Sequence, residues 1–187
     1  MSASPRQKRT PPPLDAARLD ELALAYVARF AASAAKLESY LQRKLRERGW
    51  GGETAPDLGG IVARFVAAGY IDDATYARMK AGSLRRRGYG ERRIGEALGA
   101  AGIAGDLRDE VRGGEGEQRR AALAFARRRR LGPFGPAAPD RATREKQLAA
   151  MLRAGHRMDL ARTMVHAADS AAAEEWAGEP DEEDSGL

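Results

Sequence analysis

Gly69-Tyr70-Ile71-Asp72-Asp73-Ala74-Thr75-Tyr76-Ala77 joins two predicted helices, and Arg85-Arg86-Arg87-Gly88-Tyr89-Gly90-Glu91-Arg92-Arg93-Ile94 lies at the end of the second. Glycine is favoured just after a helix because it adopts a positive φ without steric cost. Aspartate is favoured at a helix start, where its carboxylate accepts free backbone N–H groups. We therefore expect Gly69 to end one helix and Asp72 or Asp73 to begin the next, with capping rather than metal binding as the role of this acidic pair.

Apolar residues recur three and four positions apart on both sides of this segment, which predicts amphipathic helices. No segment alternates every second residue, so we expect no sheet. The sequence predicts an all-α chain with helices over about 19–30, 33–49, 54–69, 72–87, 90–102, 106–112, 117–130, 148–155 and 158–168.

Glycines that end helices recur at a constant interval. Gly49, Gly102 and Gly155 are 53 residues apart, and apolar residues precede each of them by four positions. Units of this kind bury little surface alone and must pack on their neighbours. We predict three tandem three-helix repeats that form an elongated, curved body, over residues 14–70, 71–114 and 115–169, between a disordered basic, proline-rich arm (1–13) and a disordered acidic tail (170–187).

The composition argues against most enzyme classes. There is no cysteine and there are two histidines, His156 and His166, without an acidic cluster near either in the sequence. Serines lack a glycine elbow and a base, so we predict neither catalytic residues nor a metal or other cofactor. No apolar run reaches the roughly 20 residues that span a bilayer, and the start lacks a signal-peptide core, so we expect a cytoplasmic protein with no membrane partner.

Positive charge is concentrated in the body of the chain. The net charge is +5, although the first 13 residues carry three cations and the residues from 174 onward carry seven acids, so the body carries +9. Arginines gather at the ends of two predicted helices: Arg85, Arg86, Arg87, Arg92 and Arg93, and Arg127, Arg128, Arg129 and Arg130. The helix dipole accounts for one or two of these residues, and arginine suits bidentate contact with phosphate or carboxylate. We interpret the two clusters as a partner-binding face.

The central motif resembles the RecX family of bacterial recombination regulators. The resemblance rests on Gly69-Tyr70-Ile71-Asp72-Asp73-x-x-Tyr76-Ala77 and on Gly88-Tyr89-Gly90-x-x-Arg93-Ile94-x-x-x-Leu98-x-x-x-Gly102-Ile103, and it extends over roughly residues 20–170. It departs at Ile71, where leucine is usual, and at Ala97, where an acid is common. We assign Gly69, Tyr70, Asp72, Asp73, Tyr76, Gly90 and Gly102 to the joints between repeats.

The resemblance implies a non-enzymatic regulator that binds RecA and its filament on single-stranded DNA, and we expect this regulator to be a monomer. It implies inhibition of recombinase, ATPase and coprotease activities, and hence modulation of recombination, DNA repair and the SOS response. It also allows direct contact with DNA. The alternative is a helical nucleic-acid-binding protein that acts independently of RecA, because a basic three-helix unit can mimic a helix-turn-helix.

Overall fold

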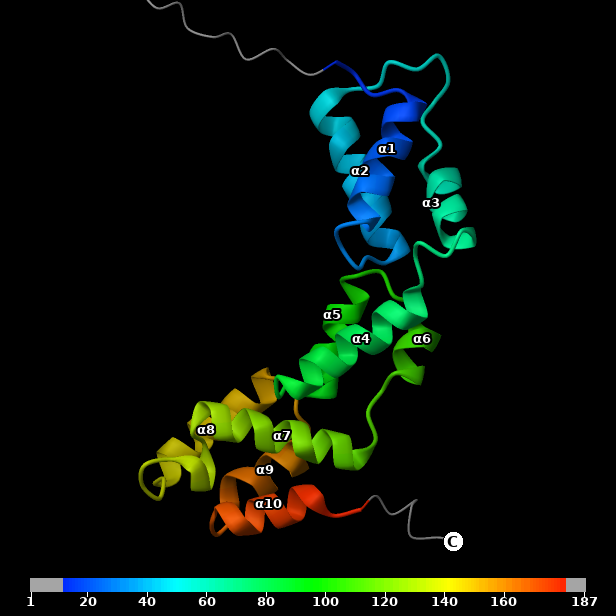
Figure 1. Ribbon diagram of the computed structural model, residues 1–187. Helices are drawn as coiled ribbons and strands as arrows, with labels where there is room; N and C mark the ends of the chain where they lie inside the picture. Colours follow the sequence, from blue (N-terminus) through cyan, green and yellow to red (C-terminus); the bar gives the residue numbers. More distant parts are fainter. Residues whose placement is uncertain (1–11, 181–187) are drawn as a thin grey trace, which may run out of the picture. The chain divides into compact units, whose positions relative to one another are not determined.

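The computed structural model describes residues 12–180, and its regular structure is helical (Figure 1). Within these residues there is no strand, and one isolated bridge pairs Leu14 with Trp50. None of the helices in this range is long and apolar enough to cross a bilayer. The predicted all-α class is confirmed.

Contacts along the chain define two compact units, one ending at Asp73 and one beginning at Ala74. The first unit holds α1 (Ala16–Val27), α2 (Ala34–Arg48) and α3 (Leu58–Ala67). An oxygen acceptor precedes each helix, since the side chains of Asp15, Ser33 and Asp57 accept N–H groups of the first turn. The core of this unit is formed mainly by Leu14, Leu19, Leu37, Leu41, Ile61 and Ile71.

Two predicted helix boundaries in the first unit are wrong. We expected the first helix to extend to about residue 30, but α1 ends at Val27 and Phe30 is 54% exposed. The chain must turn there because Ser33 already caps α2 in an extended conformation. We expected the third helix to start at residue 54 or 56, but Asp57 supplies the cap, with its carboxylate 2.8 Å from the N–H of Gly60.

The second unit holds the remaining helices, of which α4 begins at the boundary residue. They are α4 (Asp73–Arg86), α5 (Glu91–Gly99), α6 (Gly105–Glu110), α7 (Glu115–Arg129), the short 3-10 helix η1 (Gly132–Phe134), α8 (Arg141–Arg153), α9 (Met158–His166) and α10 (Ser170–Gly178). One core cluster lies under α4 and α5, and a second lies among α7, α8, α9 and α10. Tyr89 packs against both clusters, so this ring links the two cores.

The equally spaced glycines end their helices as predicted. Gly49, Gly102 and Gly155 have φ values of 78°, 74° and 95°, which are left-handed conformations that favour glycine. After the last two, Ile103 and His156 each donate their backbone N–H back to the helix carbonyl five residues earlier. Three α-helices fall in each of the ranges 14–70, 71–114 and 115–169, the last of which also holds η1, and α10 follows them. The division into repeats with these boundaries, and the curved outline, stay predictions.

The predicted disorder of residues 170–187 is wrong for its first part. Ser170–Gly178 form α10, whose side chains Ala173 and Ala177 are buried against the core beside α7 (Figure 1). The carboxylate of Asp169 caps this helix by accepting the N–H of Ala172 at 2.8 Å. Alanine is the best helix former, so the alanine-rich segment needs only a cap and a core to pack on. The rest of the tail (181–187) and most of the N-terminal arm (1–11) lie outside the described residues.

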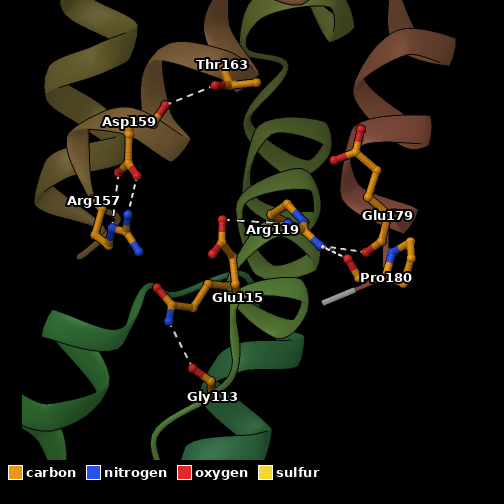
Figure 2. Close-up of polar contacts among 9 residues, drawn as sticks. Gly113, Glu115, Arg119, Arg157, Asp159, Thr163, Glu179 and Pro180 are labelled. Carbon is orange, nitrogen blue, oxygen red and sulfur yellow. Dashed lines mark hydrogen bonds and ion pairs between the residues drawn. The ribbon is translucent and has the colours of Figure 1, made fainter. Parts of the chain in front are cut away.

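Buried Arg119 holds the end of α10 in place. Its side chain is 8% exposed, and Figure 2 shows the guanidinium between the Glu115 carboxylate and the carbonyls of Glu179 and Pro180. The Arg119 Nη2 atom lies 2.5 Å from the Glu179 oxygen and 3.2 Å from the Pro180 oxygen. A cation is favourable at a helix C-terminus, where carbonyl groups lack helical partners. The contact therefore fixes the direction in which the chain leaves α10.

Candidate partner-binding site

Two turns of the second unit interlock and set the geometry of the site. The α4–α5 turn, Gly88-Tyr89-Gly90, lies against the α8–α9 turn, Ala154-Gly155-His156. The Gly90 N–H donates to the Ala154 carbonyl at 3.0 Å, and the Arg92 N–H donates to the Gly155 carbonyl at 3.3 Å. These hydrogen bonds satisfy carbonyls that the end of α8 leaves free.

The close approach of the two turns requires glycine on both sides. A Cβ atom at Gly90 would lie 2.3 Å from the Gly155 carbonyl carbon, and one at Gly155 would lie 2.4 Å from the Arg93 nitrogen. Neither obstacle is a flexible side chain, because both are backbone atoms. The Gly88-Tyr89-Gly90 turn is therefore a backbone joint between α4–α5 and α8–α9.

His156 is buried within this joint. It is 5% exposed, its Nε2 atom lies 3.0 Å from the Gly88 oxygen, and its ring is tilted against Phe125. Because a carbonyl only accepts, Nε2 carries the proton of the neutral ring. Burial lowers the pKa of His156 from its ordinary value of 6.5, against the smaller opposing effects of the Gly88 hydrogen bond and the Glu91 carboxylate.

The joint brings arginines of both predicted clusters to one depression, the Tyr89 hollow. It is lined by Tyr89, Arg93, Phe125, Arg128, Arg129, Ala150, Arg153 and Ala154. A second depression continues it along α4 and α5, shares Tyr89 and Arg93 with it, and adds Lys80 and Arg87. Residues that are far apart in the sequence thus form one continuous surface.

Positive charge on this surface is largely uncompensated. The guanidinium groups of Arg87 and Arg128 lie 5.7 and 5.6 Å from the centre of the Tyr89 ring, at cation–π distance. Among residues 12–180, no carboxylate pairs with Arg87, Arg128, Arg129 or Arg153. Glu96 is the acid that lines the surface, and it lies 3.6 Å from Arg93 and 2.5 Å from Arg92. The arrangement suits a polyanion or an acidic protein surface.

Comparison with known proteins places this geometry in a family. A model described as the second three-helix domain of RecX matches residues 72–111. The regulatory protein RecX of Myxococcus xanthus (strain DK1622) is 32% identical over 161 residues, which cover 79% of this chain and 83% of the relative. This chain belongs to the RecX family. The membership confirms the resemblance and the prediction of a non-enzymatic regulator of RecA.

A solved RecX structure has the same fold. The crystal structure of RecX from Lactobacillus salivarius matches with a TM-score of 0.63, over 79% of this chain and 92% of that chain. The two sequences are 16% identical, so this likeness concerns the fold alone. It extends over both units of this RecX-family chain rather than over the central motif only.

Two arginines of the first cluster are engaged by groups of the chain itself, Arg85 in a mostly buried position and Arg92 at the surface. The Arg85 side chain is 11% exposed, lies 2.8 Å from the Glu91 carboxylate and 3.5 Å from that of Glu117, and donates to the Val111 carbonyl. Arg92 pairs with Glu96 and donates to the Leu152 carbonyl at 2.7 Å. The structure thus gives Arg85 an internal role. Arg86, Arg87, Arg92 and Arg93 are exposed, and of these Arg92 and Arg93 both pair with Glu96.

The second cluster divides in a similar way. Arg127 forms an ion pair with Glu174 of α10, and its guanidinium lies over the Phe134 ring. Arg128 and Arg129 line the Tyr89 hollow. Arg130 ends α7 in the left-handed conformation, with φ 54°. The corresponding residue after α4 is a glycine, Gly88, with φ 81°. The contact role assigned to both clusters stays a prediction, and it now rests on fewer side chains.

The residues assigned to the joints between repeats differ in environment. Gly69 has φ 75° after α3, and Tyr70 is 60% exposed with its ring tilted against Phe65. Tyr76 is buried in the core of the second unit. The Asp73 carboxylate accepts the Ala34 N–H at 2.9 Å, so it caps the start of α2 although it begins α4.

Sequence reasoning missed several side chains of basic or aromatic surfaces. Tyr89 could have been found because it lies between the two arginine clusters, but Arg153 stands alone in the sequence and carries no such signal. In the first unit, Tyr26 stacks on Tyr40 with ring centres 4.3 Å apart, and Arg43 lies over Tyr40. The residues that form this aromatic group come from two helices.

Among the described residues there is no group of three or more His, Cys, Asp or Glu that could hold a metal ion.

Proposed function

We propose that this RecX-family protein acts by binding the RecA filament on single-stranded DNA and that the Tyr89 hollow is its main contact. The observation that carries the proposal is the convergence of exposed arginines from the turn after α4 and from α5, α7 and α8 around one aromatic ring. Such a surface offers bidentate donors to carboxylates or phosphates, and its one acid, Glu96, pairs with Arg93 and leaves Arg87, Arg128, Arg129 and Arg153 without a carboxylate partner among residues 12–180. Binding alone, with no covalent chemistry, would inhibit ATP hydrolysis, strand exchange and coprotease action.

Inhibition of RecA provides the test. We expect the protein to lower the rate of ATP hydrolysis by RecA on single-stranded DNA at well below one molecule per DNA binding site. Arg128→Glu reverses a charge in the hollow and should weaken inhibition about tenfold, as expected of a residue central to an interface. Arg162→Glu is the matched control, because Arg162 is exposed on α9, outside this surface. Equal inhibition by the two variants would contradict the assignment of the hollow.

A second function is direct binding of single-stranded DNA at the same surface. The observation that favours it is the Tyr89 ring beside two guanidinium groups, since aromatic and arginine side chains together form stacking platforms for bases. Its affinity should fall with salt, with a log–log slope of about −0.7 for each phosphate contact. If the protein inhibits RecA only at concentrations that coat the DNA, this second function accounts for the inhibition.

A further inference from the structure

A second hollow lies on the other face of α5. It has a volume of about 490 Å³ and is bounded by α5, α6, the first turns of α7, and the start of α9. It shares no lining residue with the Tyr89 hollow or its extension along α4. Aliphatic residues Ile94, Leu98, Val111 and Leu160 contribute to its wall, together with bare backbone at Gly95. We name it the Gly95 hollow.

Gly95 is unexplained by packing within the chain. It lies inside α5, where glycine costs about 1 kcal/mol relative to alanine. A Cβ atom built on Gly95 would meet nothing within 4 Å, in contrast to Gly90 and Gly155. No part of residues 12–180 therefore needs a glycine at this position. The missing side chain leaves the helix backbone open to a group from outside the chain.

The rim of the Gly95 hollow carries unpaired positive charge. Arg108 and Arg112 are exposed and line the hollow, and no carboxylate in the described part of the chain pairs with either of them. Asp109 is the acid beside them, whereas the other rim arginines are engaged: Arg157 with Asp159 (Figure 2) and Arg92 with Glu96. Two free guanidinium groups against one free carboxylate favour an acidic group on the occupant.

We propose that the Gly95 hollow receives a segment of RecA in which an apolar side chain stands beside a carboxylate. The apolar side chain would lie over Gly95 between the aliphatic walls, and the carboxylate would bind Arg108 and Arg112. An apolar anchor within a polar rim is the usual anatomy of a protein interface. Nucleic acid fits less well, because no Phe, Tyr or Trp side chain lines the hollow and its rim includes the Asp109 carboxylate. The inference rests on the proposed binding of RecA and adds a second contact to it.

The open space at Gly95 allows a test that leaves the fold intact. Gly95→Trp fills the hollow, and Gly95→Ala is its matched control, because alanine favours the helix and is too small to block docking. Binding to RecA filaments on single-stranded DNA is measured by fluorescence anisotropy of the labelled full-length protein. We expect Gly95→Ala to bind as the wild type does, with a raised melting temperature, and Gly95→Trp to bind at least about tenfold more weakly with unchanged helical content.

A charge variant makes the test independent of the tryptophan. Arg108→Glu/Arg112→Glu should also weaken filament binding by about tenfold or more, whereas Arg162→Glu should change it less than about twofold. If both hollow variants bind as the wild type does while Arg128→Glu loses affinity, the Gly95 inference is overturned and the proposed function stands. If the wild type does not bind the filament at all, the proposed function fails and this inference fails with it.

Discussion

Arg85 and Arg86 are neighbours in the sequence, but the fold places them in opposite environments. The Arg85 guanidinium bridges two carboxylates and a carbonyl from outside its own helix, with 11% of its side chain exposed. Arg86 is exposed, and no carboxylate among residues 12–180 pairs with it. Their helix positions explain the difference, since consecutive residues of a helix point about 100° apart.

Single alanine variants should separate the two roles. Arg85→Ala leaves the mostly buried Glu91 carboxylate without its partner, so we expect the free energy of unfolding to fall by about 3 kcal/mol. Arg86→Ala should change it by less than about 0.5 kcal/mol, as for most surface substitutions. Urea denaturation measures both values. Equal losses of stability in the two variants would show that the contacts of Arg85 with Glu91, Glu117 and Val111 do not stabilise the fold.

His156 should make stability depend on pH. Its pKa is lowered in the folded protein by burial, so below the ordinary value of 6.5 the unfolded chain binds the proton more readily. Stability from this group is therefore complete above pH 6.5 and is lost as pH falls toward the lowered pKa, by up to about 1.4 kcal/mol per pH unit.

The matched variant for this prediction is His156→Gln. Its amide N–H can still donate to the Gly88 carbonyl, but it does not titrate. Denaturation in urea between pH 5 and 8 should show a steeper fall toward acid for the wild type than for His156→Gln. Parallel curves would mean that the histidine is not buried in its neutral form.

At the scale of elements, the residue that follows each of the three equally spaced glycines packs against a core: Trp50 is partly buried, and Ile103 and His156 are buried. Trp50, Ile103 and His156 come directly after Gly49, Gly102 and Gly155. The glycine spacing and the apolar periods were sufficient to predict nine helices and the absence of sheet in residues 12–180. These two features did not predict α10. Its sequence offers one capping aspartate and a run of alanines followed by acids, and the same composition is typical of a solvated tail. The Glu179 carbonyl that accepts from Arg119 is 60 residues away in the sequence. Because it is a backbone group, the residue types in the sequence do not reveal this contact.

The role of α10 can be tested by two truncations. Ending the chain after Asp169 removes a helix that buries Ala173 and Ala177 and leaves Arg119 without the carbonyls of Glu179 and Pro180. We expect a loss of at least about 3 kcal/mol in unfolding free energy from the lost burial and the exposed core. Ending the chain after Pro180 keeps all these contacts and should leave stability unchanged. Thermal unfolding by circular dichroism distinguishes the outcomes.

For the molecule as a whole, the sequence predicted where positive charge gathers but not which charges remain free. Both arginine clusters were identified, yet Arg85, Arg92 and Arg127 are engaged by Glu91, Glu96 and Glu174. That division depends on which side chains the fold brings together, and so does the contribution of Arg153 from α8. The binding surface is therefore a property of the packed second unit rather than of either cluster alone.

We expect the acidic end of the chain to act on this surface through its charge. Residues 181–187 include Asp181, Glu182, Glu183 and Asp184, so their removal raises the net charge from +5 to +9. The chain reaches Pro180 beside Arg119, about 14 Å along α7 from Arg128 at 1.5 Å per residue. Seven residues can extend to about 25 Å, so these acids can come within the range of electrostatic attraction of the Tyr89 hollow.

Deletion of residues 181–187 should therefore tighten binding of single-stranded DNA at low salt, by roughly three- to tenfold, and by much less above about 0.5 M salt, where charges are screened. A full-length variant with Asp181→Asn, Glu182→Gln, Glu183→Gln and Asp184→Asn is the matched control, because it removes the same charge and keeps the same length. Fluorescence anisotropy across a salt series measures both. If the neutralised variant binds as the wild type does while the deletion binds more tightly, the segment acts by occupying space. If neither differs from the wild type, the acidic end does not act on the hollow.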